Sequence, residues 1–171
     1  MRGELIFIPA PGVGHLVSII EFAKLLVSRD EDISVSILLK DLPCDSDLAA
    51  FTRNLKKDAP QGVVFVEIPA LDEITMTEIM SMPWFSFLFS FIDKQKTQVR
   101  NVVTTIIEQS KTSKLCGFVI DLFCTSMIDV ANEFGVPTYT FFTASAAYLS
   151  LMPNIENWKD DKRQEIYKYK D

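Results

Sequence analysis

The sequence predicts an α/β fold in which helices cover both faces of a doubly wound parallel sheet. Short runs of β-branched and apolar residues alternate with longer segments whose apolar residues recur at helical spacing. Repeated strand–helix units of this length favour a parallel sheet, because each crossover returns the chain to the same end of the sheet. With 171 residues, 48% of them hydrophobic, the chain can form one domain with a buried core.

The first half of the chain contains three predicted strands. The first strand begins at Leu5 and leaves the sheet through a Pro/Gly loop that ends at Gly14. A helix follows, because apolar residues recur at helical spacing from Leu16 to Val27. After it we expect a strand over residues 33–39, a helix over 45–58 and a strand over 63–66.

The second half shows the same alternation after an irregular stretch. Residues 69–83 break the pattern, and we expect a loop there with one helical turn near 77–80. A single long helix is expected over 84–110, because its second half carries an apolar stripe. The remaining elements are a strand over 117–120, a helix through 127–134, a strand over 138–142 and a helix over 143–152. Gly135 would end the first of these helices, and Thr143 would cap the second.

Composition and charge argue against several classes of protein. The net charge is −6, the pI is about 4.8 and the sequence has no Lys/Arg cluster, which disfavours a nucleic-acid partner. The cysteines Cys44, Cys116 and Cys124 form no CxxC pair, so neither a disulfide framework nor a zinc site is indicated. A reducing compartment fits this cysteine usage best.

No targeting or membrane-spanning segment is predicted. The apolar run near the N-terminus is interrupted by proline and glycine and lacks a small-residue cleavage signature. The apolar segment 84–92 is far shorter than the roughly 20 residues that a membrane helix needs. We therefore expect a cytoplasmic protein without integral membrane association.

His15 is the only histidine of the chain, and it follows the glycine loop at the start of the first predicted helix. This position lies just beyond the carboxyl end of the first strand, where open α/β sheets bind ligands. The helix dipole there opposes protonation, so we expect a neutral imidazole that can accept a proton near pH 7. The alternative is a histidine that only caps the helix or packs at its start.

Asp121 stands at the carboxyl end of the fourth predicted strand. In a doubly wound sheet the first and fourth strands can be neighbours at the switch point, which would bring Asp121 and His15 into one crevice. A carboxylate bonded to one imidazole nitrogen fixes the tautomer and stabilises the imidazolium that forms when the other nitrogen takes a proton. The alternative is that Asp121 caps the helix that follows it.

The loop Gly12–Val13–Gly14 is similar to the start of a dinucleotide-binding fingerprint, but the third glycine position holds Val17. A dinucleotide-dependent oxidoreductase therefore stays open as an alternative with weak support. The glycines fit better with a tight backbone turn and the close approach of a ligand, which makes Gly14 a candidate substrate-binding residue.

Aromatic and methionine residues are dense between Met80 and Phe89, and aromatic density of this kind usually indicates core. Trp84 and Phe123, however, are expected on loops at the same sheet edge as His15. Such residues can line a pocket for a flat apolar molecule, and Phe142 joins this set from the fifth strand. A non-catalytic module that binds a small molecule is therefore a second open reading.

Three segments together resemble the amino-terminal half of a plant family 1 UDP-glycosyltransferase. They are residues 7–16, 117–121 and 141–145, and they occur in the order and spacing of that family. The resemblance runs from about Leu5 to Met152, which is nearly the whole chain.

The resemblance implies the amino-terminal, Rossmann-like domain of a GT-B fold that binds the acceptor. It also implies inverting, metal-independent transfer of a sugar from a UDP-sugar to a hydroxyl of a small lipophilic acceptor, such as a phenol, flavonoid or terpenoid. His15 then matches the catalytic base and Asp121 its partner. Thr143 matches a residue that contacts the donor sugar.

The chain also departs from the family. Members bind the UDP-sugar mainly through a carboxy-terminal domain with a box containing Trp, His, Glu and Gln, and nothing like this box occurs in the sequence. We expect residues 1–155 to form the acceptor-binding domain. Residues 156–171, of which ten of sixteen are charged, would then be a connector towards a missing donor domain. The resemblance implies no cofactor, UDP-sugar binding only with that second domain, and no activity of the chain alone.

Overall fold

The computed structural model describes residues 2–40, 51–52, 55, 59–110 and 112–151. It divides into two units, which meet in the sequence between Phe141 and Phe142. The helix expected over 45–58 and the connector expected over 156–171 lie largely or wholly outside the described residues.

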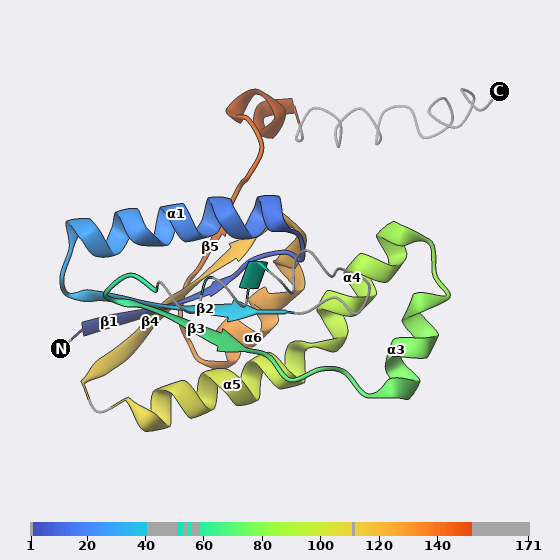
Figure 1. The fold of residues 1–171 in the computed structure, drawn as a ribbon, viewed down its shortest axis with the longest axis horizontal. Helices are drawn as coiled ribbons and strands as arrows, with labels where there is room; N and C mark the ends of the chain where they lie inside the picture. Colours follow the sequence, from blue (N-terminus) through green and yellow to red (C-terminus); the bar gives the residue numbers. More distant parts are fainter. Residues whose placement is uncertain (1, 41–50, 53–54, 56–58, 111, 152–171) are drawn as a thin grey trace. The chain divides into compact units, whose positions relative to one another are not determined.

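The first unit is built on a five-stranded sheet in which every neighbouring pair of strands is parallel (Figure 1). The strand order is β3-β2-β1-β4-β5, so the predicted α/β class and the pairing of the first and fourth strands are confirmed. The strands are β1 (Arg2–Ile8), β2 (Ile33–Leu39), β3 (Val63–Glu67), β4 (Ser113–Asp121) and β5 (Thr138–Phe141).

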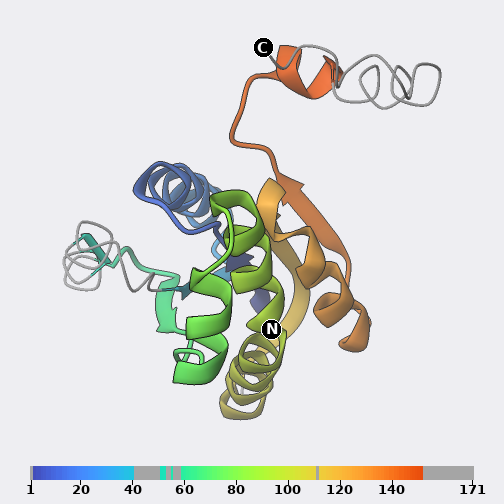
Figure 2. The ribbon, with the colours of Figure 1, turned by 90° about the vertical axis from the view of Figure 1, so that its right-hand side faces the viewer.

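The two faces of the sheet are buried by different helices. Helix α1 (Val13–Arg29) packs on one face, where Phe7 of β1 is buried. Helices from the second half of the chain cover the other face, where Ile6 and Ile8 are buried (Figure 2). Phe7 and its neighbours Ile6 and Ile8 are buried on different faces because successive side chains of a strand point to opposite sides of the sheet. The carboxyl ends of the paired strands β1 and β4 lie side by side between the two helical layers.

The segment expected to be mostly loop contains a further helix, α3 (Glu73–Met80). The side chain of Asp72 caps this helix by accepting a hydrogen bond from the backbone N–H of Thr75 at 2.9 Å. The helical turn predicted near 77–80 is therefore present as the end of α3, but the prediction of a loop before it was wrong, because the helix begins at Glu73. The apolar residues of α3 are too irregularly spaced to predict a helix. The capping residue Asp72 was the local sequence signal for the start of this helix.

The single helix expected over 84–110 is two helices, α4 (Trp84–Lys94) and α5 (Lys96–Gln109). The break falls at Gln95, whose φ of −85° and ψ of 0° place it outside regular helix geometry. Neither glycine nor proline marks this position, so apolar periodicity alone could not reveal it. Both helices bury residues in the same core, including Phe91 of α4 and Val99 of α5.

The second unit, described by itself, is helical over residues 146–151, the last of the described residues. The hydroxyl of Ser145 accepts a hydrogen bond from the N–H of Tyr148 at 3.2 Å, so Ser145 caps the helix and the prediction of Thr143 as its cap was wrong. In this unit the ring of Phe142 stacks on that of Tyr148. Within the described parts of the chain, no helix combines the length and apolar character required to cross a bilayer.

Candidate active site

The loop between β1 and α1 depends on Gly12 for its shape. This residue precedes the first turn of α1 with a φ of 130°, a conformation that residues with a side chain rarely adopt. Its carbonyl accepts the first hydrogen bond of the helix, from Leu16 at 3.1 Å. The sharp entry fixes His15 in the first helical turn, beside the carboxyl end of β1.

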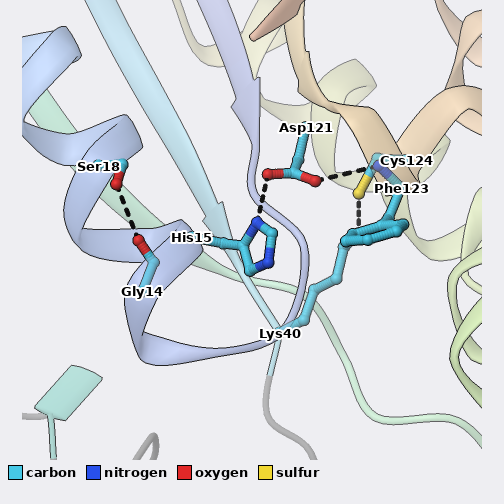
Figure 3. Close-up of polar contacts among 7 residues, drawn as sticks. All are labelled: Gly14, His15, Ser18, Lys40, Asp121, Phe123 and Cys124. Atoms are coloured by element: carbon cyan, nitrogen blue, oxygen red, sulfur yellow. Dashed lines mark hydrogen bonds and ion pairs between the residues drawn. The ribbon is translucent and has the colours of Figure 1, made fainter. Parts of the chain in front are cut away.

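Asp121 is the last residue of β4 and is completely buried. Its Oδ2 lies 2.7 Å from Nδ1 of His15, whose side chain is 28% exposed (Figure 3). Its Oδ1 accepts a hydrogen bond from the N–H of Phe123 at 3.0 Å. The predicted proximity of the two side chains is therefore confirmed, and the alternative role of Asp121 as a helix cap is present as well.

The cap is made on a 3-10 helix, η2 (Leu122–Met127), which precedes α6 (Ile128–Glu133). The sequence predicted only one helix in this region. The tighter first turn brings the N–H of Phe123 onto the carboxylate only two residues earlier. The carboxylate is thus held from both sides, with one oxygen on the backbone and the other on the imidazole.

The pKa of His15 is raised above its usual value of 6.5, chiefly by the hydrogen bond to Asp121 and also by the charge of that carboxylate, while burial acts in the opposite direction. The sequence-based expectation that the helix dipole opposes protonation of His15 did not include the hydrogen bond and the charge of Asp121, which raise the pKa. Because a carboxylate oxygen accepts, Nδ1 carries a hydrogen. The other ring nitrogen, Nε2, points away from Asp121 (Figure 3) and is the atom that would take up a proton.

Aromatic rings extend from the histidine onto helix α4. The ring of Phe123 meets that of His15 edge-on at 5.5 Å, and Phe89 meets Phe123 in the same way at 6.1 Å. We call the rings of Phe123 and Phe89 the aromatic row. From the sequence, Phe89 was identified only as one of the closely spaced aromatic and methionine residues between Met80 and Phe89. The available signal was its place on the exposed side of α4, roughly opposite the buried Phe91.

The other predicted substrate-binding residues take different positions. Trp84 is exposed at the start of α4, where its ring lies against Phe87 at 5.6 Å. Gly14 is exposed in the first turn of α1, where an added Cβ would meet open space. Phe142 and Thr143 belong to the second unit, so their role beside His15 stays a prediction.

A buried lysine completes the described surroundings of the pair. Lys40 follows β2 and is 4% exposed, and its Nζ donates to Sγ of Cys124 at 3.7 Å (Figure 3). Burial raises the pKa of the Cys124 thiol, with the charges of Lys40 and Asp121 acting on it in opposite directions. Sequence reasoning missed Lys40, although a charged residue directly after a buried strand was a visible signal.

The arrangement can accept a proton from a weakly acidic hydroxyl placed against the aromatic row. A histidine oriented by a buried carboxylate is a recurrent general base. Among the described residues there is no group of three or more His, Cys, Asp or Glu side chains that could hold a metal ion.

Comparison with known proteins identifies relatives over nearly the whole chain, although no protein-family model matches it. UDP-glucose flavonoid 3-O-glucosyltransferase 6 of Fragaria ananassa is 40% identical over 173 residues, which cover 98% of this chain and 35% of the relative. UDP-glycosyltransferase 71E1 of Stevia rebaudiana is 44% identical, covering 92% of this chain and 31% of that protein.

The fold is similar to that of solved enzymes of the same kind. The structure of Medicago truncatula UGT71G1 complexed with UDP-glucose matches with a TM-score of 0.75 and 35% identity, covering 91% of this chain and 32% of the other. The chain thus spans about a third of the length of the curated relatives that it matches. By sequence and by fold, the chain is homologous to plant UDP-glycosyltransferases, and its parallel sheet matches the amino-terminal, Rossmann-like domain of their GT-B architecture.

Proposed function

We propose that this chain is the acceptor-binding domain of a UDP-glycosyltransferase that transfers a sugar to a hydroxyl of a small lipophilic acceptor. The observation that carries the proposal is the His15–Asp121 pair, with a buried carboxylate 2.7 Å from the imidazole, next to the aromatic row. A phenol, flavonoid or terpenoid would lie against Phe123 and Phe89 with its hydroxyl at Nε2 of His15.

In this mechanism His15 removes the proton of the acceptor hydroxyl at Nε2. Asp121 stabilises the imidazolium through Nδ1, and deprotonation of a phenol with a pKa of about 10 is a modest task for such a pair. The acceptor oxygen then attacks the anomeric carbon of the sugar in line. The bond between that carbon and the diphosphate oxygen breaks, and UDP leaves with inversion at the anomeric centre.

The donor requires residues beyond those that the structure describes. UDP-glucose is bound in the structure of the Medicago relative, of which this chain covers 32%. We propose that residues 1–155 hold the acceptor, that 156–171 lead towards a donor domain, and that Thr143 contacts the donor sugar. UDP-sugar is a co-substrate in this scheme, the transfer needs neither metal nor cofactor, and the protein acts in the cytoplasm.

The test is a chimera that joins this chain to the carboxy-terminal domain of the Medicago relative. His15→Ala should lower the rate of glucosylation of a phenolic acceptor by about 10²–10⁴-fold, the usual loss on removing a general base. Lys24→Ala, an exposed change on the same helix, is the matched control and should leave the rate unchanged. Near-full activity of His15→Ala would exclude His15 as the base.

The same variant separates catalysis from simple binding. Exposed aromatic side chains such as Trp84 and Phe85 also fit a module that binds an apolar molecule without reacting with it. If the chimera forms no glycoside while both the wild type and His15→Ala bind the acceptor equally well, the binding module is the better description.

A further inference from the structure

A surface pocket adjoins the aromatic row, because Phe89 and Phe123 are part of its lining. Its volume is about 350 Å³, which is within the usual range for small-molecule sites. The rest of the lining comes from the end of α4 and from η2, including Lys94 and Thr125, and we call this cavity the rim pocket. His15 and Asp121 do not line it.

The polar lining of the rim pocket contains two accessible hydrogen-bond donors. Lys94, the last residue of α4, is exposed, and its ammonium makes no ion pair or hydrogen bond with any described residue. Thr125 is also exposed, and its hydroxyl has no protein partner in the described part of the chain. Asp93 is the one carboxylate of the lining, and its Oδ1 is already bound by Lys96 at 2.7 Å. The groups still available to a ligand are therefore a cation and a hydroxyl.

These two donors favour a carboxylate at the far end of an acceptor. An ammonium and a hydroxyl can both donate to a carboxylate, whereas they offer nothing to a hydrocarbon. Because the chain carries a net charge of −6, an anion is attracted only by a local cation, and Lys94 supplies one beside the two rings. Since water and salt screen an exposed charge, the expected preference for an anion is small, about threefold.

The spacing of the rings sets the length of such an acceptor. The ring centres of His15 and Phe123 are 5.5 Å apart, and those of Phe123 and Phe89 are 6.1 Å apart. A single ring with its hydroxyl at Nε2 of His15 would cover Phe123, so a second, linked ring is needed to reach Phe89 and the rim pocket.

We infer that the acceptor is an aromatic hydroxy acid of two linked rings, whose carboxylate lies between Lys94 and Thr125 while its hydroxyl lies at His15. This inference rests on the proposed function, because His15 decides which end of the molecule reacts. Lys94 is then a specificity-determining residue that contacts the acceptor away from the reacting atoms. It should lower the KM for the acid without changing kcat.

The first test measures binding to the chain itself with ¹³C-methyl-labelled threonine. The probes are 4′-hydroxybiphenyl-4-carboxylate and the corresponding 4-carboxamide, which have the same shape and differ in charge. The methyl signal of Thr125 should shift with both probes, whereas that of Thr104, which is exposed on α5 and does not line the pocket, should not. The carboxylate should bind about threefold more tightly at low salt and equally well at about 1 M salt.

Two variants with the same change in net charge assign the preference to its source. Lys94→Met keeps a long unbranched side chain without the charge and should bind the two probes equally. Lys24→Met, an exposed change on α1, is the matched control and should keep the preference. In the chimera with the Medicago domain, Lys94→Met should lower the ratio of kcat/KM for carboxylate over carboxamide about threefold, through KM alone.

Three results would overturn the inference. Absence of a Thr125 shift would mean that the acceptor does not enter the rim pocket. Equal affinity of the wild type for the two probes at low salt would exclude a carboxylate contact with Lys94. Loss of the preference in Lys24→Met as well as in Lys94→Met would assign it to the net charge of the chain. The proposed function fails separately: if His15→Ala keeps its activity while Lys94→Met loses the preference, the base is wrong and the carboxylate contact stands.

Discussion

Replacement of Asp121 by asparagine tests the pair without removing the cap. The carbonyl oxygen of asparagine can still accept from the N–H of Phe123, which the wild-type carboxylate binds at 3.0 Å. What disappears is the negative charge beside Nδ1 of His15. Because that hydrogen bond and that charge are what raise the pKa of His15, while burial lowers it, the Asp121→Asn variant should titrate at lower pH than the wild type.

The same change alters how stability depends on pH. The folded-state pKa of His15 is raised above the unfolded value of 6.5, so the protonated pair contributes stability that is fully present below pH 6.5. This contribution is lost as the pH rises through the folded pKa. A hydrogen bond between charged groups is worth about 1 kcal/mol more than a neutral one. Asp121→Asn should therefore destabilise the chain by about 1 kcal/mol more at pH 5.5 than at pH 9, equivalent to about 2–4 °C in melting temperature.

The single histidine of the sequence makes the assay simple, because the imidazole proton region of the NMR spectrum contains one titrating residue. Urea unfolding at pH 5.5 and pH 9 gives the two free energies for wild type and variant. Asp129→Asn removes an exposed carboxylate that is paired with Lys96 and serves as the control. An unchanged or increased His15 pKa in Asp121→Asn, or a loss of stability that is the same at both pH values, would refute the coupling.

Three further predictions follow from the same geometry. Gly12→Ala should destabilise the chain by about 1–3 kcal/mol in chemical unfolding and weaken the His15–Asp121 pair, because alanine rarely adopts a φ of 130°; Gly14→Ala, without such a φ, is the control and should cost less than half as much. Lys40→Met should raise the pKa of the Cys124 thiol further, because the charge of Lys40 and its hydrogen bond to Sγ both lower that pKa, and an unchanged thiol titration by cysteine-selective ¹³C NMR would contradict this. The chain alone should bind a flavonoid-like phenol weakly in calorimetry, bind UDP-glucose hardly at all and form no glycoside by mass spectrometry; steady turnover would contradict the need for a donor domain.

The strands and the pair were predictable because their signals are local. Strand β2 follows directly from the β-branched run that ends at Leu39. His15 and Asp121 stand where a strand ends and a helix begins, and the parallel order of the sheet then brings two such ends together. Position in the chain, together with one topological rule, was sufficient to predict that these two side chains would meet.

The features that were missed depend on tertiary contacts. The break at Gln95 has no helix-breaking residue, and it becomes visible only when α4 and α5 are each packed on the core. The contact between Lys40 and Cys124 joins residues 84 positions apart, which no periodicity can report. Phe89 was visible as an apolar residue, but its approach to Phe123 depends on how α4 lies against η2.

The two readings of Asp121, as a cap and as the partner of a base, are not alternatives in this fold. The N–H of Phe123 immobilises one carboxylate oxygen, and this leaves the other directed at His15. The same two-residue turn carries the ring of Phe123 to the edge of the imidazole. One short segment thus orients the proposed base and also builds the first surface that an acceptor would touch. A substitution that disturbs the cap should therefore alter proton transfer and acceptor binding together, whereas Asp121→Asn, which keeps the cap, should affect proton transfer alone.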